Sequence, residues 1–97
     1  MPYIKKTRRP KIIKKTKKLL KHLSEEGDFN YAISLLMHGY IEQHGLRYKN
    51  LNAIMGVMDS ASKEFYRTVV APYEDKKMSE NGAVSTLDWK PKNSLHD

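Results

Sequence analysis

The feature that most constrains the fold is the stretch 51–70, which reads LNAIMGVMDSASKEFYRTVV. Its apolar side chains recur at steps of three and four residues, which places them on one face of an α-helix. We expect Pro72 to end this helix, because the residue before a proline disfavours helical geometry. Other helices must cover this apolar face, so the sequence predicts an all-α fold. The face consists of Leu51, Ile54, Met55, Met58, Ala61, Phe65 and Val69.

Two more helices are expected before this stretch. Pro10 suits the first residue of a helix, and Gly27 suits a left-handed cap after its last residue. Asp28 is a good N-cap for the next helix, which should end at Gly45. The connections are short, and short connections favour antiparallel neighbours. The apolar positions are Ile12, Thr16, Leu19, Leu20 and Leu23 in the first helix, and Phe29, Ala32, Ile33, Leu36, Met37, Tyr40 and Ile41 in the second.

The chain after Pro72 is expected to be less regular. Residues 73–82 begin with acidic side chains and end at Gly82, which is typical of a short helix or helical turn. Residues 83–97 show no periodicity and are interpreted as an irregular tail that is either mobile or laid across the surface, with Trp89 as the one residue able to anchor it. The predicted organisation is a basic N-terminal arm (1–9), a helical domain (10–82) and the tail (83–97). We expect the helical domain to be a small antiparallel bundle of three main helices plus the short C-terminal element.

Composition excludes several classes of protein. The 97 residues suit one small domain. No run of about eighteen apolar residues is present, and no apolar segment follows the basic N-terminus, so we expect neither a membrane span nor a secretory signal. The absence of cysteine excludes disulfides and thiolate chemistry and fits a cytoplasmic protein. We predict no enzymatic activity, no cofactor and no metal site, because the chain lacks a phosphate loop and a nucleophile elbow and its histidines lack ligand spacing. The histidines are His22, His38, His44 and His96.

Positive charge is concentrated at the N-terminus. Residues 1–24 hold ten of the eighteen Lys and Arg residues and no acid, whereas the remaining 73 residues hold eight basic and eleven acidic side chains, a net charge of −3. Basic side chains on one surface can neutralise phosphates and release counterions, so nucleic acid is the predicted partner. An anionic membrane surface is less favoured, because the apolar face of this helix has no Trp or Phe. The candidate nucleic-acid-binding residues are Lys5, Lys6, Arg8, Arg9, Lys11, Lys14, Lys15, Lys17, Lys18 and Lys21.

A second group of candidates lies at the start of the second helix and the end of the third. In an antiparallel pair these ends are neighbours, so the side chains could meet. One interpretation is a pocket for a nucleotide-like ligand, since arginine can hold a phosphate and tyrosines can stack. The favoured interpretation is a structural network, in which Arg67 holds Glu74 or Asp75 while Glu64 pairs within its helix. The group consists of Asn30, Tyr31, Glu64, Arg67 and Tyr73.

Four fragments of the chain resemble a known family. They are MPYI at the start, GDFNYAI at 27–33, EFYRTVVAPYEDKK at 64–77 and NG at 81–82. Over residues 1–84 the chain is similar to a group of short prokaryotic and phage proteins classed as a domain of unknown function. It departs from their pattern in its lysine-rich first helix and in Thr68, where a second arginine is expected. The resemblance implies no activity or cofactor, but it implies a phage or mobile-element setting in a bacterial or phage-infected cell.

Two hypotheses of function follow from these observations. In the first, the chain is a non-enzymatic protein that binds nucleic acid through residues 5–21. In the second, it is a phage-type oligomeric protein that sequesters a nucleotide signal or inhibits a host protein at the junction of Tyr31, Arg67 and Tyr73. A structural interaction module without either ligand is a third interpretation.

Overall fold

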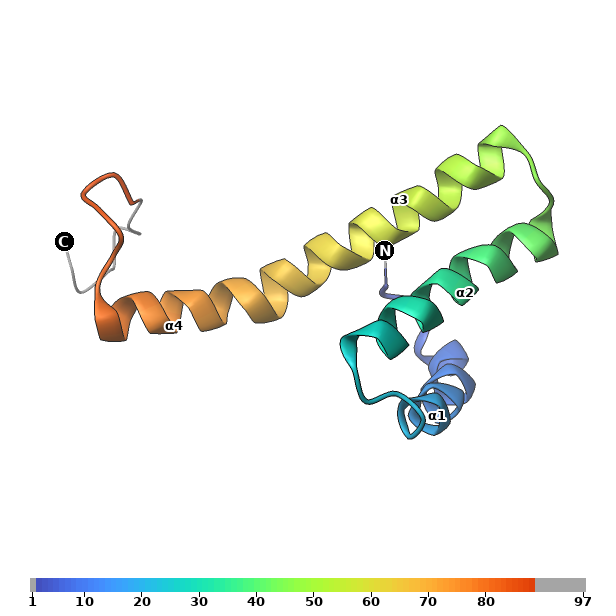
Figure 1. The fold of residues 1–97 in the computed structure, drawn as a ribbon, viewed down its shortest axis with the longest axis horizontal. Coiled ribbons are helices and arrows are strands. Elements are labelled where there is room, and N and C mark those ends of the chain that lie inside the picture. The colour runs from blue at the N-terminus through green and yellow to red at the C-terminus, as the bar shows by residue number, and fades with distance from the viewer. Residues whose placement is uncertain (1, 89–97) are drawn as a thin grey trace. The chain divides into compact units, whose positions relative to one another are not determined.

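The structure is a computed structural model that describes residues 2–88. In chain order it contains a 3-10 turn η1 (Lys6–Arg8), helices α1 (Arg9–Leu20), α2 (Glu26–His44) and α3 (Tyr48–Phe65), a π-helical turn η2 (Tyr66–Val70) and helix α4 (Ala71–Asn81) (Figure 1). None of the residues 2–88 is in a strand, which confirms the all-α prediction. The chain divides into two compact units, which we call unit 1 (Met1–Ser62) and unit 2 (Lys63–Asp97). Trp89, the one tail residue able to act as an anchor, lies outside the described residues.

In unit 1, α2 and α3 form a helical hairpin around Gly45 (Figure 1). Gly45 follows the last residue of α2, as predicted, with a φ of 108° that side chains with a Cβ rarely adopt. The Asn50 side-chain amide closes the turn by donating to the carbonyl oxygens of His44 and Gly45, at 3.0 Å each. These hydrogen bonds satisfy acceptors that the end of a helix leaves without partners. With the turn closed in this way, α3 begins at Tyr48, earlier than the predicted start at residue 51.

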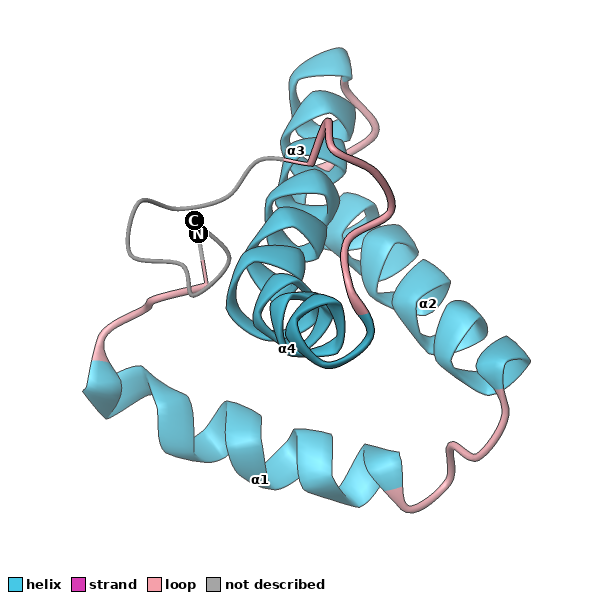
Figure 2. Ribbon diagram, turned by 90° about the vertical axis from the view of Figure 1, so that its left-hand side faces the viewer, coloured by secondary structure: helices cyan, strands magenta, loops and turns pink. Residues whose placement is uncertain are grey.

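Helix α1 is set crosswise to α2. Figure 1 views α1 nearly along its axis while α2 lies across the page, and Figure 2 shows α1 at full length. On either side of the turn at Gly45, α2 and α3 point in roughly opposite directions (Figure 1). The packed antiparallel bundle of three helices stays a prediction.

The boundary between α1 and α2 differs from the predicted one. Helix α1 ends at Leu20 and α2 begins at Glu26, so Gly27 lies in the first turn of α2. Its φ is not positive, as a left-handed cap would require, and the prediction that it caps the first helix is wrong. Asp28 is the third residue of α2 rather than its N-cap. Glu25 occupies the N-cap position, with extended backbone angles of −102° and 161°.

Asp28 nevertheless stabilises the start of α2. Its carboxylate accepts hydrogen bonds from the backbone N–H groups of Ser24 at 2.9 Å and Glu25 at 3.1 Å. The Glu25 side chain accepts in turn from the backbone N–H of Asp28, which completes a capping box. The bond from the Ser24 N–H, followed by that from Glu25, lowers the pKa of the Asp28 carboxyl below its ordinary value.

In unit 2 the helix continues through Pro72 instead of ending before it. Proline has no N–H, and in a regular α-helix its ring clashes with the carbonyl four residues earlier. The turn η2 is wider, and the N–H of Ala71 donates to the carbonyl of Tyr66, five residues back. Pro72 then lies in the first turn of α4, where a proline is tolerated. The predicted helix end at Pro72 is wrong, whereas the predicted short helix that ends before Gly82 is confirmed.

Neither unit encloses an apolar core within the described chain. None of the residues 2–88 is buried, and large apolar side chains such as Leu36 and Met55 are 66% and 64% exposed. A buried residue in the core of an independent domain typically contacts about six to twelve other residues and is shielded from water. The amphipathic faces predicted from the sequence are therefore present, and their large apolar side chains are not buried within either unit.

Candidate functional site

The strongest candidate site is the lysine-rich face of α1. The helical repeat places its lysines on about 160° of the helix circumference and its large apolar side chains on an opposite arc of about 120°. The twelve residues of α1 span about 18 Å. This arrangement makes α1 a short amphipathic helix with one continuous cationic face. The face, which we call the lysine face, consists of five residues of α1 and the residue that caps its C-terminus: Lys11, Lys14, Lys15, Lys17, Lys18 and Lys21.

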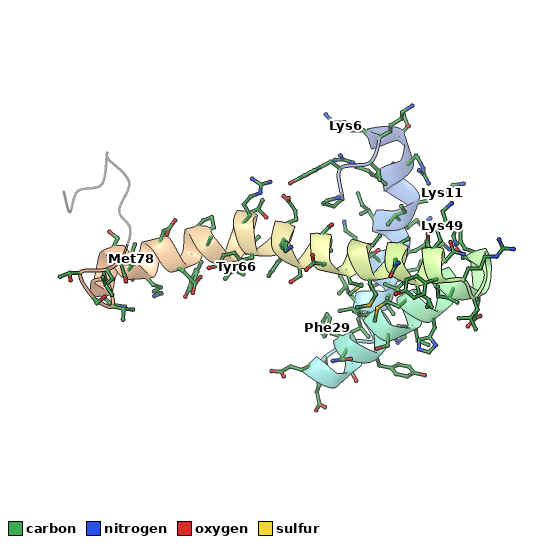
Figure 3. The ribbon with its side chains drawn as sticks, turned by 90° about the horizontal axis from the view of Figure 1, so that it is seen from above. Lys6, Lys11, Phe29, Lys49, Tyr66 and Met78 are labelled. Atoms are coloured by element: carbon green, nitrogen blue, oxygen red, sulfur yellow. The ribbon has the colours of Figure 1, made fainter. Side chains whose placement is uncertain are left out.

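The lysine face is open to solvent and has no acidic partner among residues 2–88. Its six side chains are exposed, and the ion pairs Arg67–Glu64 and Lys77–Glu80 lie on other elements. Lys6 and Lys11 extend away from the ribbon (Figure 3). Arg9 is partly engaged, because its Nε donates to the carbonyl oxygen of Ile4 at 2.9 Å and ties the preceding residues to the helix. The predicted arm at 1–9 is thus partly helical, through η1, and Lys5, Lys6 and Arg8 remain exposed beside the lysine face.

The unit 2 part of the predicted junction forms a local network around η2. Arg67 Nη2 donates to both carboxylate oxygens of Glu64, at 2.9 and 3.0 Å. The Glu64 side chain is 15% exposed, whereas that of Arg67 is 69% exposed. The pairing of Glu64 within its helix is therefore present, as the structural interpretation predicted. Most of the guanidinium-bearing side chain still faces water.

Glu74 is hydrogen-bonded to Tyr66 and not to Arg67, which the structural interpretation had predicted as its partner. The Tyr66 hydroxyl donates to Glu74 Oε1 at 3.0 Å, across the π-helical turn. This hydrogen bond and the charge of Glu74 raise the pKa of the Tyr66 hydroxyl above its ordinary value. Tyr73 lies one residue before Glu74 and is exposed, and Lys77 Nζ lies 5.6 Å from the centre of its ring, within the range of a cation–π contact.

Asn30 and Tyr31 lie in the first half of α2, where both are exposed. They belong to unit 1, whereas Arg67 and Tyr73 belong to unit 2. Their meeting in one pocket therefore stays a prediction.

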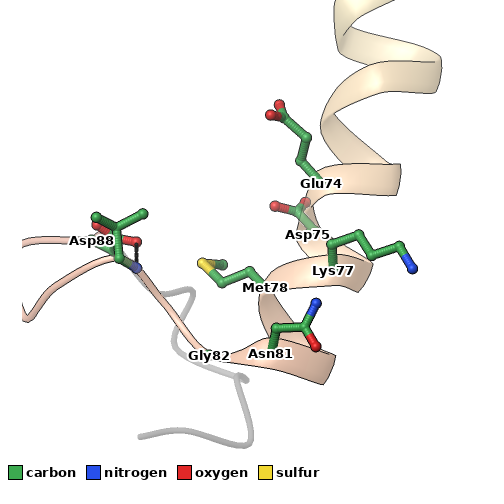
Figure 4. A pocket seen from close by; sticks show the side chains of 8 residues that line it. Glu74, Asp75, Lys77, Met78, Asn81, Gly82 and Asp88 are labelled. Carbon is green, nitrogen blue, oxygen red and sulfur yellow. Dashed lines mark hydrogen bonds between the residues drawn. The ribbon is translucent and has the colours of Figure 1, made fainter.

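An open groove of about 450 Å³ lies beside the end of α4 in unit 2 (Figure 4). Glu74, Asp75 and Asp88 contribute its acidic groups, but the Asp88 carboxylate is already used to accept the backbone N–H of Val84 at 2.9 Å. No cluster of three or more metal-ligating side chains occurs within residues 2–88. His96 lies outside this range. The groove is therefore a surface feature of unit 2 without a built metal site.

The match to a protein family covers most of the chain. Residues 1–84 match DUF6899, a domain of unknown function. The chain belongs to the DUF6899 family. This result confirms the resemblance that the four sequence fragments carry. No curated protein and no solved structure matches the chain.

The DUF6899 match includes everything from η1 to α4, so the lysine face and the Arg67 network both lie within the family's domain. Within residues 2–88, no helix is long and apolar enough to cross a membrane.

The sequence analysis missed an apolar groove in the hairpin of this DUF6899 domain. The groove lies between α2 and α3 and holds about 410 Å³. Part of the signal was present in the sequence, because Met37 and Ile41 belong to the predicted apolar face of the second helix and Leu51, Ile54 and Met55 to that of the third. The groove itself depends on how two helices lie together, which periodicity along one helix does not report. Its apolar lining includes Met37, Ile41, Leu46, Leu51, Ile54 and Met55.

Proposed function

We propose that this protein binds nucleic acid through phosphate contacts made by the lysine face and the basic residues just before it. The observation that carries the proposal is the continuous arc of exposed lysines on one side of α1, in a segment (1–24) that contains no acid. Solvated helix faces that serve only solubility usually mix charges of both signs. Phosphate contacts supply affinity without reading base sequence, so the proposed binding is largely independent of sequence.

The charge density of α1 supports this proposal. A duplex carries one phosphate for about every 1.7 Å of its axis, so a length of 18 Å offers about ten phosphates. The lysine face presents six ammonium groups along a similar length. One helix reaches only one side of a duplex, so we expect about four to six contacts, which is enough for strongly salt-dependent binding.

The test is fluorescence anisotropy of labelled duplex DNA, single-stranded DNA and RNA over a series of salt concentrations. Four or more contacts predict a slope of about −4 or steeper when log affinity is plotted against log salt concentration. Replacing Lys14, Lys15, Lys17 and Lys18 together by glutamine should reduce that slope to about −2 or less. Glutamine keeps the helix propensity of lysine, so α1 should remain helical.

A matched variant separates the lysine face from net charge. Replacing Lys49, Lys63, Lys76 and Lys77 by glutamine removes the same four charges from other elements. This variant should bind with nearly the slope of the original chain. An equal loss of slope in both variants would mean that binding depends only on the net positive charge of the protein. Unchanged binding after loss of the four lysines in α1 would mean that the interface lies elsewhere. Either result would contradict the proposal.

A second candidate function uses the Arg67 network of unit 2. The observation that favours it is the π-helical turn, because such turns often occur at functional sites, together with the exposed side chains of Arg67 and Tyr73. In this alternative the protein sequesters a nucleotide signal or blocks a host protein. The test is to measure the melting temperature of the protein in the presence of each of a panel of nucleotides. This function is supported if one nucleotide raises the melting temperature of the original chain and of the four-lysine variant but not that of Arg67→Gln. A flat panel would count against the nucleotide form of this function.

A further inference from the structure

We propose that the apolar groove between α2 and α3 is filled by a second copy of this chain, so that the protein is a homodimer. The groove belongs entirely to unit 1 and is lined by side chains from both helices of the hairpin and from the turn between them. None of the described residues that line it is buried. This proposal concerns a different surface from the lysine face and does not depend on nucleic-acid binding.

Helix α2 has more apolar surface than the hairpin can cover. Its apolar side chains occupy about 240° of the helix circumference, from Leu35 through Leu36 and Phe29 to Ile41. A helix that is apolar on nearly all sides is typical of a buried position. The groove with α3 uses Met37 and Ile41, which lie at one edge of this arc. Ala32 and Tyr40 are half-buried, but the large apolar side chains of Phe29, Leu35 and Leu36 are exposed. Helix α2 therefore has the composition of a buried helix while most of its apolar surface faces solvent.

A second copy is the occupant that the chain's own properties favour. None of the residues 2–88 is buried, so the hairpin has little to hold it folded before a partner arrives. Obligate homodimers solve this problem because folding and association are coupled. The net charge of the hairpin is small enough for two copies to pack together. Residues 25–62, which hold the hairpin, carry two basic and five acidic side chains, in contrast to the ten basic groups of residues 1–24. Two hairpins can meet with little repulsion while the lysine faces stay in solvent.

The test is the mass of the full chain by sedimentation velocity at about 0.3 M salt, where the Debye length is only about 5–6 Å and attraction between exposed charges is screened. We expect twice the mass of 11.3 kDa and a melting temperature that rises with protein concentration. Leu46→Glu places a charge in the groove and should weaken dimerisation at least tenfold. Leu87→Glu is the matched control, because Leu87 is 92% exposed in unit 2 and should leave the dimer intact.

A single thiol provides a measurement that does not require Leu46→Glu to fold. The chain has no cysteine, so Met55→Cys introduces one thiol, in the groove. Mild oxidation should give a covalent dimer, whereas Leu87→Cys should give only the slow background reaction. A monomer that melts cooperatively at a temperature independent of concentration would overturn the proposal. A dimer in which the groove variants behave like the Leu87 variants would overturn it as well, because the contact would lie elsewhere.

Discussion

At the scale of single residues, the best-defined interactions of this protein are local. Asp28 binds backbone groups within four residues of itself, Asn50 closes the turn five and six residues back, and Tyr66 binds Glu74 eight residues ahead. Such contacts define helix ends and turns, but they bury little apolar surface. They explain how each helix is specified by its own sequence even though no described residue is buried.

The variant Asp28→Asn should destabilise the chain at neutral pH and much less in acid. Hydrogen bonds from the Ser24 and Glu25 N–H groups lower the pKa of Asp28 in the folded chain, so folding favours the ionised carboxylate. This contribution is fully present above the ordinary carboxyl pKa of 3.8 and is lost as the pH falls through the lowered folded value. Urea unfolding followed by circular dichroism should show a lower midpoint for Asp28→Asn at pH 7, and the two midpoints should converge toward about pH 2.

Asp75→Asn is the control for this prediction. Asp75 lies in the first half of α4, and within residues 2–88 its carboxylate caps no backbone N–H. Its replacement should leave the unfolding midpoint close to that of the original chain at both pH values. A neutral-pH midpoint of Asp28→Asn equal to that of the original chain would contradict the capping role.

At the scale of elements, the sequence predicted helix ends well where one residue decides the end by its own backbone conformation. Gly45 and Gly82 both adopt the positive φ that glycine favours, and both follow the last residue of a helix. Gly27 and Asp28 were placed wrongly because the capping box moves the start of α2 upstream to Glu25, which the pattern of single residues does not reveal.

Among the candidate sites, too, those that depend on one helix could be predicted and those that depend on the arrangement of several elements could not. The lysine face could be predicted because it requires only the period of one helix and a count of charges. The apolar groove could not, since it depends on the angle and distance between α2 and α3, which the Gly45 turn and the Asn50 amide set. The binding of Glu74 by Tyr66 was also missed, because it follows from the π-helical turn that the sequence analysis did not anticipate.

The variant Pro72→Ala should convert η2 toward regular α-helix. Alanine restores the N–H that proline lacks and removes the ring clash with the carbonyl four residues earlier, so the helix no longer needs the wider turn. We expect a stabilisation of about 1–3 kcal/mol by urea unfolding, together with slower amide exchange over 66–70. Pro10→Ala is the control, because Pro10 lies in the first turn of α1, and it should change stability by less than about 0.5 kcal/mol. Unchanged exchange in Pro72→Ala would mean that side chains, not the proline, hold the π turn.

At the scale of the whole molecule, the two proposals give different functions to two surfaces of unit 1, the lysine face and the apolar surface of the hairpin. The lysine face supplies attraction to phosphate and is most effective when it stays in water. The hairpin supplies apolar area that is unfavourable in water until another surface covers it. A dimer built through the hairpins would carry two lysine faces in one particle, and the number of phosphates that it neutralises would rise accordingly.

This coupling gives the last prediction. If both lysine faces of a dimer contact one duplex, Leu46→Glu should reduce the salt slope of DNA binding by about half while leaving α1 intact, because slope counts the neutralised phosphates at about 0.9 each. The four-lysine variant should do the reverse, losing slope while keeping the dimer mass. Sedimentation and anisotropy on the same two variants therefore separate the proposals. A Leu46→Glu monomer that binds with the full slope would show that each lysine face acts alone, and a four-lysine variant that dissociates would place α1 in the dimer contact.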